Sequence, residues 1–414
     1  MPRLPPSLIQ RARSISPRLA TLLPACRDLD SARNELRWIR EHVAASTSAS
    51  ASSDQLDTSR NVRIRPSETQ VAATAADTER RNNHEREVAS LCRRRARGEP
   101  LQYLLGSQPF GPLDIQCRRG VLIPRPETEE WTVALASEVI AYLAVPNSLS
   151  PEDSKKRLRI VDFCTGTGCI PLLLYALLHR QFPNLQVWGF DVEERAVRLA
   201  RENLRYNVAR GLLPSSLLSQ GEPSTATAQS NDAEGGVKFE EADIFADEWL
   251  QLLPRQDGSS DFIDVLVSNP PYISAKGFNC DTGRSVRNHE PKLALVPYPR
   301  QSTASSLDEQ GAAGGCAPED VFYERLCEVA DILKPKIMVF EVGDLDQAFR
   351  VAQMAVMAFG ERLQDLEIWR DFPGVEMVDP PADSERPLEE TYIEGRRVSI
   401  SGIGHGRSVL IHLS

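Results

Sequence analysis

From Leu158 to the C-terminus, short apolar runs alternate with amphipathic segments. The apolar runs predict buried strands at 158–163, 185–191, 237–245, 262–269, 336–343, 364–371 and 407–414. Helical spacing of apolar residues predicts helices between them, at 168–182, 193–207, 321–333 and 345–359. Strands that are apolar along their whole length are typical of a sheet covered by helices on both faces. The pattern therefore predicts a doubly wound α/β domain.

The N-terminal part of the chain has a helical pattern instead. Helices are expected at 22–43 and 80–97, and Gly98 and Pro100 end the second one. Between them, residues 46–80 are rich in Ser, Ala and Thr, which predicts a flexible insertion.

Polar, low-complexity stretches also interrupt the α/β region, and they predict surface insertions at 211–236 and 301–318. A polar linker is expected near 147–156. The predicted domains are a helical N-terminal domain at 28–110, a hairpin and linker at 111–150, and an α/β domain at 151–414.

Composition and charge narrow the class of protein. The chain has 41% hydrophobic and 26% charged residues, and its net charge of −10 gives no general attraction to nucleic acid or anionic membrane. No apolar run approaches the ~20 residues of a membrane-spanning helix. The eight cysteines form no CxxC pair, so we expect no metal site and no disulfide framework. A reducing compartment, no direct nucleic-acid or membrane binding, and a monomer are the default expectations.

The segment 1–27 has the composition of an organelle transit peptide. It is rich in arginine, contains several serines, and has no acidic residue before Asp28. The alternative is a disordered basic arm, since three prolines lie among the first six residues. The composition predicts targeting to the mitochondrion, with the matrix as the destination.

The segment VDFCTGTGCI (161–170) joins the first strand of the α/β domain to its first helix. Gly166 and Gly168 let the backbone turn tightly and approach a ligand at the carboxyl end of the strand. The spacing lacks the third Rossmann glycine and the P-loop lysine, which disfavours a phosphate cradle.

Acidic residues follow the next two strands. Asp191 ends the second strand, where a carboxylate can accept both ribose hydroxyls of an adenosine, as in NAD or S-adenosylmethionine. The structural alternative is a cap for the following helix. Asp243 follows the third strand and is expected to reach an adenine edge or to cap a turn.

The fourth strand ends in Asn269-Pro270-Pro271-Tyr272, in the stretch VSNPPYIS. Two prolines terminate a strand by themselves, so a simple stop signal is one interpretation. In the same sheet as the glycine loop, however, the Asn269 amide oxygen and the Pro270 carbonyl would give two acceptors for a planar NH2 group. Tyr272 would supply a flat wall for the group that carries this nitrogen.

Asn-Pro-Pro-Tyr at this place resembles class I methyltransferases that act on planar nitrogens, either adenine N6 or glutamine N5. Further segments are similar, in this order, to the HemK/PrmC family of protein-(glutamine-N5) methyltransferases: GEPLQYLLGSQPF (98–110), GVLIPRPETEEW (120–131), VRNHEPKLAL (286–295), FYERL (322–326) and FEVGDLDQA (340–348). The resemblance runs from residue 85 to residue 414, between the insertions.

This resemblance implies a class I, Rossmann-like methyltransferase domain with a seven-stranded sheet, and a helical N-terminal domain that recognises the substrate. It implies S-adenosylmethionine as the methyl donor. It also implies methylation of the glutamine in the Gly-Gly-Gln motif of a peptide-chain release factor, here a mitochondrial one.

Motifs and resemblance together predict the site residues. The predicted catalytic residues are Asn269, Pro270 and Tyr272. The substrate is expected to contact these residues and also Pro271, Arg125 and Glu127. The predicted cofactor-binding residues are Cys164, Thr165, Gly166, Thr167, Gly168, Asp191, Asp243, Ile244 and Asn269.

The motif IPRPETE leaves two interpretations open. Arg125, Glu127 and Glu129 could line the cleft that admits the substrate loop, or an Arg/Glu salt bridge could lock the two domains together. Pro124 and Pro126 hold this segment extended in either case.

The chain departs from the family pattern in three places. Cys164 stands where the pattern usually has glycine, and it is expected to be a small buried residue rather than a reactive thiol. Ile244 stands where bacterial members often have an aromatic residue. The C-terminal segment 374–413 is longer than in bacterial members, and the sequence assigns no role to the extra length.

Two other functions fit parts of the sequence. A nucleic-acid adenine-N6 methyltransferase would share the site chemistry, but the net charge of −10 and the IPRPETE segment disfavour it. A non-catalytic release-factor-binding protein on a methyltransferase fold is disfavoured because the glycine loop and Asn-Pro-Pro-Tyr are both intact.

Overall fold

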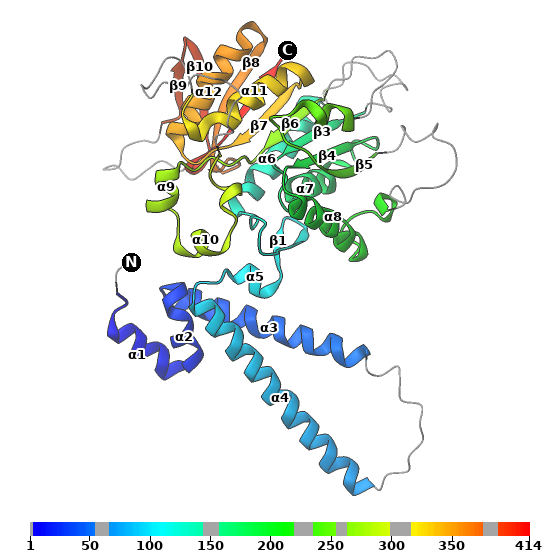
Figure 1. Cartoon of the computed structure of the whole chain (residues 1–414), viewed down its shortest axis with the longest axis vertical. Helices are drawn as coiled ribbons and strands as arrows, with labels where there is room; N and C mark the ends of the chain where they lie inside the picture. The colour runs from blue at the N-terminus through cyan, green and yellow to red at the C-terminus, as the bar shows by residue number, and fades with distance from the viewer. Residues whose placement is uncertain are drawn as a thin grey trace. The chain divides into compact units, whose positions relative to one another are not determined.

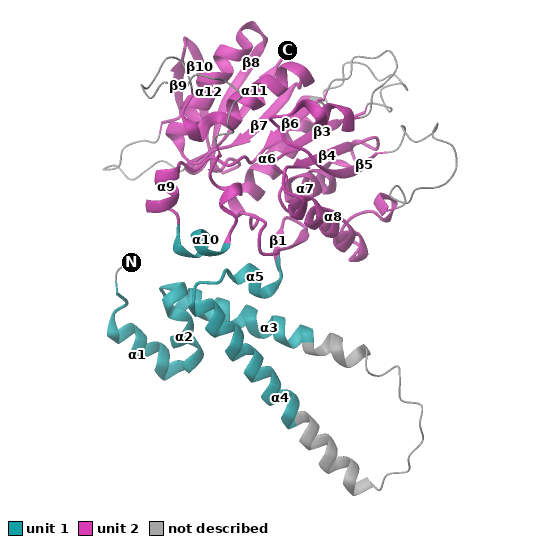
Figure 2. Ribbon diagram, viewed as in Figure 1, with its two compact units in different colours: residues 1–107, 283–289 teal, residues 108–282, 290–414 magenta. Residues whose placement is uncertain are grey.

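The computed structural model of the chain describes residues 3–53, 66–143, 157–218, 235–253, 263–298, 316–375 and 388–414. They form two compact units, shown in separate colours in Figure 2. The first unit comprises residues 1–107 and 283–289, and the second comprises residues 108–282 and 290–414. We describe each unit by itself.

The first unit is helical (Figure 1). Its helices are α1 (Pro6–Ile15), α2 (Pro17–Cys26), α3 (Leu29–Ser53), α4 (Pro66–Ala96), α5 (Leu101–Leu105) and α10 (Arg284–His289). The helix predicted at 22–43 is broken in two. Arg27 adopts a left-handed φ of 71° after α2. The Asp28 carboxylate then accepts hydrogen bonds from the backbone N–H groups of Asp30 and Ser31 and caps α3.

The segment predicted to be a transit peptide is folded into this unit. The apolar sides of α1 and α2 contribute Ala12, Leu19, Leu22 and Leu23 to a core that also contains residues of α3, α4 and α5. The predicted domain start at residue 28 therefore differs from the structure, because the hydrophobic face of α2 is buried against α3 and α4.

The predicted insertions lie only partly within the described residues. Of the segment 46–80, the described parts continue α3 and α4 as helix, and residues 54–65 lie outside the described residues. The segments 219–234, 254–262, 299–315 and 376–387 also lie outside them, as does most of the predicted linker at 147–156.

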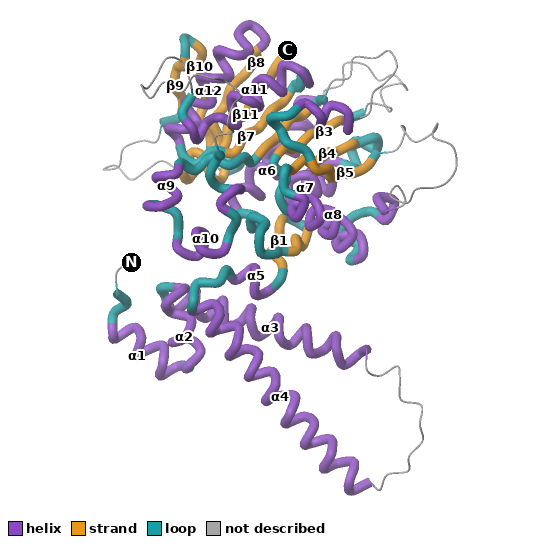
Figure 3. Tube along the Cα trace, viewed as in Figure 1, coloured by secondary structure: helices purple, strands orange, loops and turns teal. Residues whose placement is uncertain are grey.

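The second unit contains a large sheet, in which strands alternate with helices along the chain (Figure 3). Its strands are β3 (Arg159–Phe163), β4 (Gln186–Asp191), β5 (Gly236–Glu241), β6 (Val265–Ser268), β7 (Ile337–Glu341), β8 (Leu363–Phe372), β9 (Glu390–Ile393), β10 (Arg396–Ser401) and β11 (Ile403–Leu413). Their order is β5-β4-β3-β6-β7-β11-β8-β10-β9. The sheet is parallel from β5 to β7, and β11 is antiparallel to both of its neighbours.

This order confirms the class I methyltransferase arrangement but corrects the number of strands. A seven-stranded sheet was expected, and the sheet has nine strands in the described residues. The two additional strands, β9 and β10, come from the long C-terminal segment. They extend the edge of the sheet because β10 pairs in parallel with β8 and β9 pairs with β10.

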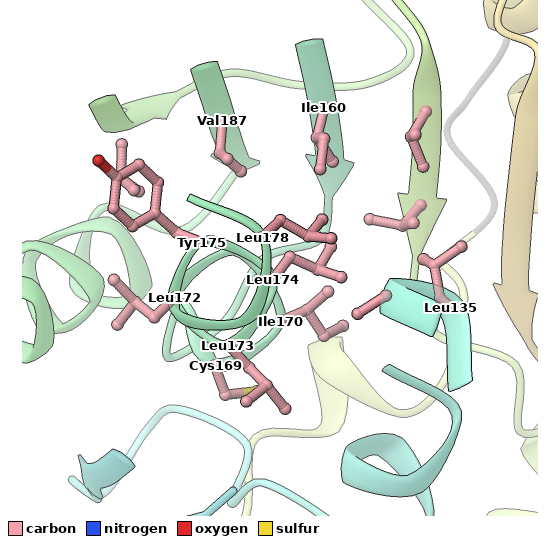
Figure 4. Close-up of a cluster of buried hydrophobic side chains, with 14 of the residues drawn as sticks. Leu135, Ile160, Cys169, Ile170, Leu172, Leu173, Leu174, Tyr175, Leu178 and Val187 are labelled. Atoms are coloured by element: carbon pink, nitrogen blue, oxygen red, sulfur yellow. The ribbon is translucent and has the colours of Figure 1, made fainter. Parts of the chain in front are cut away.

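Each face of the sheet is covered by its own helices. These helices are α6 (Pro126–Leu143), α7 (Cys169–Leu178), α8 (Glu194–Ala209), α11 (Val321–Leu333) and α12 (Leu345–Phe359), and a short α9 (Ala275–Cys280) follows β6. Val187, Ile160, Val265 and Ile337 form one row across four strands, in a core with residues of α6, α7 and α8. Figure 4 shows this cluster around α7.

The next row across the same strands points to the opposite face. Trp188, Val161, Leu266 and Met338 belong to a second core, which contains residues of α11 and α12. The two-residue period of a strand therefore places successive side chains in different cores. This arrangement explains why the central strands are apolar along their whole length.

A separate hairpin and linker was predicted at 111–150, and its described part, residues 111–143, packs into the second unit. The hairpin strands are β1 (Ser107–Phe110) and β2 (Leu113–Gln116). The buried Asn203 and Asn207 of α8 accept hydrogen bonds from the backbone N–H groups of Gln116 and Asp114, at 2.7 and 3.0 Å. Helix α6 then packs against α7 and β8.

Within the described ranges, no helix is both long enough and apolar enough to cross a membrane.

Candidate active site

The loops that follow β3, β4, β5 and β6 meet at one edge of the sheet. Phe163, the last residue of β3, is in register with Phe190 of β4 and Ser268 of β6. The chain order reverses at β3, so this edge is the switch point at which open α/β sheets bind ligands. A pocket lies here, and residues from all four loops line it.

Tight backbone contacts hold the loop after β3. The N–H of Thr165 donates to the carbonyl of Phe190 at 3.0 Å, and the N–H of Gly168 donates to the carbonyl of Thr165 at 2.9 Å. The buried Asn203 side chain donates to the carbonyl of Thr167 at 3.0 Å. Contacts with strand β4 and helix α8 therefore both fix the backbone conformation of this loop.

The two loop glycines serve different purposes. Gly166 has a φ of 57°, and a Cβ at its position would meet open space. Gly168 has a φ of 77°, and a Cβ there would lie 2.8 Å from the Phe239 ring and 2.9 Å from Cβ of Ala200. Gly168 thus allows close packing between the loop, β5 and α8, while Gly166 borders the pocket.

Cys164 shows why the family pattern usually has glycine at its position. Its φ of 62° lies in the left-handed region, which costs a residue with a Cβ about 1 kcal/mol or more. Burial raises the pKa of its thiol well above the usual value. The thiol is therefore protonated at neutral pH, although the side chain is only half-buried and lines the pocket.

Asp191 connects the glycine loop to the end of β4. Its carboxylate accepts the N–H of Gly166 at 2.8 Å and the N–H of Glu193 at 2.9 Å, so it also fixes the turn that leads into α8. Burial raises its pKa to about 6, and these two backbone hydrogen bonds oppose the shift. Each carboxylate oxygen retains a further lone pair for a ligand hydroxyl.

Two residues after β5 line the pocket, and one of them is polar and the other apolar. The Asp243 carboxylate accepts the N–H of Phe245 at 2.9 Å, which is a turn cap, and the residue also lines the pocket. Ile244 is 5% exposed and lines the pocket next to it. Its carbonyl accepts a hydrogen bond from Arg325 at 2.8 Å, which holds this turn against α11.

Most of the predicted cofactor-binding residues line this pocket. These residues are Cys164, Thr165, Gly166, Thr167, Asp191, Asp243, Ile244 and Asn269. Gly168 does not line it and acts through packing, as described above. Several lining residues were not predicted, including Val192, Leu293, Phe322 and the segment 120–124.

The Asn-Pro-Pro-Tyr segment separates this pocket from a smaller one. Asn269 lines both pockets, Pro271 lines the larger one, and Tyr272 lines the smaller one. Pro270 is buried and lines neither. The smaller pocket is otherwise lined mainly by apolar residues: Leu122, Ile273, Ala294 and Leu295, with Arg125 and Glu341.

A buried carboxylate, Glu341 at the end of β7, lies behind Asn269. It is 1% exposed and accepts hydrogen bonds from the Thr128 hydroxyl at 2.6 Å, the Trp131 indole at 2.8 Å and the Tyr272 phenol at 3.1 Å. The Asn269 amide nitrogen lies 3.3 Å from the Thr128 hydroxyl oxygen. Burial raises the pKas of both Glu341 and Tyr272.

The IPRPETE segment forms a salt bridge, but within the second unit. Arg125 donates to the buried Glu290 carboxylate at 2.8 Å, and the other oxygen of Glu290 accepts the N–H of Ile123 at 3.1 Å. The salt bridge therefore does not join the two units, although one interpretation of the motif expected it to do so. Arg125 also lines both pockets. Glu127 and Glu129 lie in the first turn of α6 and line neither pocket.

Sequence reasoning did not single out Thr128, Glu341, Asn203 or Asn207 as site-supporting residues. For each of the two pairs, the sequence contained a feature that could have pointed to it. Thr128 and Glu341 lie inside quoted motifs, and Glu341 is a charged residue directly after the apolar run of β7. Asn203 and Asn207 are four residues apart on α8, so they share one helix face.

The lining of the larger pocket distinguishes between the two adenosine cofactors that the sequence allowed. Asp191, Glu193 and Asp243 line it, and Arg125 is the one basic residue among the described residues that do so. A dinucleotide needs donors and positive charge for its pyrophosphate. S-adenosylmethionine carries a sulfonium cation and no phosphate, so this lining fits it. Among the described residues, no group of His, Cys, Asp and Glu is placed to hold a metal ion.

Comparisons with known proteins identify relatives of this chain. The chain is 33% identical over 298 residues to the mitochondrial MRF1 N(5)-glutamine methyltransferase MTQ1 of Saccharomyces cerevisiae, covering 72% of this chain and 68% of that protein. It is 32% identical over 265 residues to the Schizosaccharomyces pombe protein named "Probable MRF1 mitochondrial N(5)-glutamine methyltransferase mtq1", covering 64% and 70%. A release factor glutamine methyltransferase of Thermodesulfovibrio yellowstonii is 26% identical, covering 70% and 79%.

Two other comparisons carry less information. No protein-family model matches the chain. The solved structure of a human methyltransferase 10 domain containing protein superposes with a TM-score of 0.37 and 14% identity, covering 73% of this chain and 89% of that chain.

Strand order, pocket lining and the extent of the sequence similarity agree with one another. The chain belongs to the HemK/PrmC family of protein-(glutamine-N5) methyltransferases, and it is an enzyme that uses S-adenosylmethionine.

Proposed function

We propose that this enzyme methylates the side-chain nitrogen of the glutamine in the Gly-Gly-Gln motif of a mitochondrial peptide-chain release factor. The observation that carries the proposal is the position of Asn269. It lines both the pocket that fits S-adenosylmethionine and the smaller, mainly apolar pocket beside it. A substrate nitrogen bound at Asn269 would therefore lie between the methyl donor in the larger pocket and the rest of its own side chain in the smaller pocket.

The smaller pocket suits a glutamine side chain. Leu122, Ile273 and Leu295 offer apolar contacts for its methylene groups. The Asn269 amide oxygen would accept one N–H group of the substrate amide, and the carbonyl of the adjacent Pro270, a residue that lines neither pocket, would accept the other. The Tyr272 ring would form a flat wall beside it.

The reaction depends on positioning. An amide nitrogen is a weak nucleophile, because its lone pair is delocalised into the carbonyl. Two acceptors that hold its N–H groups orient the nitrogen and make it more electron-rich. S-adenosylmethionine, when bound, supplies the electrophilic methyl group. Asp191, Asp243 and Ile244 would hold its adenosine part. Since alkylation makes the nitrogen more acidic, its proton can leave to water after transfer.

Two independent features support the mitochondrial assignment. The N-terminal segment is rich in arginine and has no acidic residue before Asp28, although part of it also packs into the core of the helical unit. Both yeast relatives carry "mitochondrial" in their names and act on the protein MRF1 by those names. We assign the enzyme to the matrix. Fusing residues 1–27 to a fluorescent reporter tests this, and a reporter that stays in the cytosol would count against it.

The substrate is tested by transfer of label. The full-length enzyme is incubated with labelled S-adenosylmethionine and a mitochondrial release factor, either wild type or with its Gly-Gly-Gln motif changed to Gly-Gly-Ala. Label on the wild-type factor alone is the expected result. Label on DNA or RNA instead, or equal labelling of both factors, would overturn the proposal. A monomer is expected on the same sample by light scattering.

A further inference from the structure

Two motifs far apart in the chain meet behind Asn269. Thr128 belongs to IPRPETE and Glu341 to FEVG, and their side chains are joined by a 2.6 Å hydrogen bond across 213 residues. The Thr128 hydroxyl oxygen is also 3.3 Å from the Asn269 amide nitrogen. Thr128 is 2% exposed, so its hydroxyl has no alternative partner in bulk water.

The chemistry of these groups determines the direction of each hydrogen bond. The same oxygen of Glu341, Oε2, receives both the Trp131 indole at 2.8 Å and the Thr128 hydroxyl. An indole N–H can only donate, and the ionised carboxylate of Glu341 can only accept, so this oxygen accepts from both groups. Thr128 has a single proton, and it gives this proton to Glu341. The lone pairs of its hydroxyl are then left for Asn269.

Asn269 must therefore present its NH2 group to Thr128. Which end of an asparagine amide is oxygen follows from such partners rather than from atom positions. With Nδ2 facing Thr128, Oδ1 is the end that remains for a ligand in the pockets that Asn269 lines. The reverse orientation would offer a donor to a substrate N–H, and two donors repel one another.

From these contacts we infer that Thr128, oriented by Glu341, is a positioning residue that sets the amide orientation of Asn269 so that its oxygen faces the acceptor nitrogen. This inference rests on the proposed function. Two neighbouring hydrogen bonds hold this arrangement. The Thr132 hydroxyl donates to the Thr128 carbonyl at 2.6 Å, and the Tyr272 hydroxyl donates to the other oxygen of Glu341 at 3.1 Å.

Three variants of the full-length enzyme test the inference. Thr128→Val keeps the volume and removes the hydroxyl. Thr128→Ser keeps the hydroxyl. Trp131→Phe removes the other hydrogen bond to the same Glu341 oxygen without touching Asn269. We expect Thr128→Val to lower kcat/KM for the release factor about tenfold, the value of one hydrogen bond. We expect the other two variants to stay within about threefold of wild type, measured below their Tm.

Two measurements do not depend on turnover. The Kd for S-adenosylhomocysteine should be the same in wild type and all three variants. In protein with ¹⁵N-labelled asparagine, the Asn269 side-chain signal, assigned by its loss in Asn269→Ala, should shift in Thr128→Val and stay in place in Thr128→Ser. An unmoved signal together with full activity in Thr128→Val would overturn the inference, as would an equal loss of activity in Trp131→Phe. A wild-type enzyme that leaves the release factor unlabelled would instead count against the proposed function, and the amide signal would still test the inference.

Discussion

Arg125 and Glu290 form an ion pair at 2.8 Å that connects two motifs 165 residues apart. Glu290 is buried and also accepts the backbone N–H of Ile123, so it holds the IPRPETE segment against the segment that follows α10. Both segments contribute lining residues to the larger pocket. The ion pair therefore shapes the site as well as stabilising the fold.

Removing the buried partner should destabilise this unit. Glu290→Ala leaves the Ile123 N–H without its acceptor and the Arg125 guanidinium without its counter-charge. We expect a loss of about 3 kcal/mol in the free energy of unfolding, measured by urea denaturation. Glu290→Gln is the matched control, since it keeps an acceptor for Ile123, and it should lose clearly less. Equal losses in the two variants would mean that the charge alone matters.

Asn269 should matter for transfer and little for cofactor binding. Asn269→Ala removes an acceptor for the substrate NH2, and we expect kcat to fall about 100-fold or more. The Kd for S-adenosylhomocysteine, measured by calorimetry, should change little, because many other residues line that pocket. Normal turnover in this variant would contradict the assignment of Asn269 as a catalytic residue.

The raised pKa of Asp191 predicts pH-dependent cofactor binding. The ionised carboxylate is the form that accepts ribose hydroxyls, and its pKa in the free protein is about 6. Affinity for S-adenosylhomocysteine should therefore rise with pH through this value and level off above it. Asp191→Asn should bind about tenfold more weakly at pH 7 and lose this dependence.

Cofactor affinity must be measured directly, by calorimetry. The contribution of Asp191 to the free energy of unfolding changes with pH in the opposite direction to its effect on affinity. The pKa of Asp191 in the folded protein lies above the 3.8 of an unperturbed aspartate. This group alone therefore stabilises the fold most below pH 3.8, and the contribution is lost as pH rises through about 6. A shift in Tm would mix the two effects. A Kd that does not change between pH 5 and pH 7 would show that Asp191 serves only to fix the turn that leads into α8.

The two loop glycines should differ in their tolerance of a methyl group. Both have a positive φ, so alanine is strained at either position. Only at Gly168 would the new Cβ also collide with Phe239 and Ala200, at 2.8 and 2.9 Å. We expect Gly168→Ala to lower the free energy of unfolding by about 2 kcal/mol more than Gly166→Ala. Similar losses by urea denaturation would contradict the packing role of Gly168.

Removal of residues 1–27 should damage the helical unit. It deletes four buried core residues of α1 and α2, namely Ala12, Leu19, Leu22 and Leu23. Burying each leucine contributes about 2 kcal/mol. We expect α3 and the end of α4 near Val88 to lose protection against hydrogen exchange, while a shorter deletion of residues 1–4 leaves them protected. Unchanged protection after the long deletion would fit a removable targeting segment.

The sequence determined those parts of the fold that depend on local period. The helices Val321–Leu333 and Leu345–Phe359 begin and end at the predicted residues. The central strands were found because a strand buried on both faces is apolar throughout. Asp191, Asp243 and Asn269 were found because parallel strands bring their carboxyl ends to one edge of the sheet.

Tertiary structure decided what depends on residues distant in sequence. The pattern could not show that Arg27 and Asp28 break a helix, or that α1 and α2 join the core, because both depend on packing against α3 and α4. It could not show that the C-terminal segment adds β9 and β10, since an edge strand needs a partner. The link from Glu341 through Thr128 to Asn269 likewise exists only after folding brings strand β7 and helix α6 together.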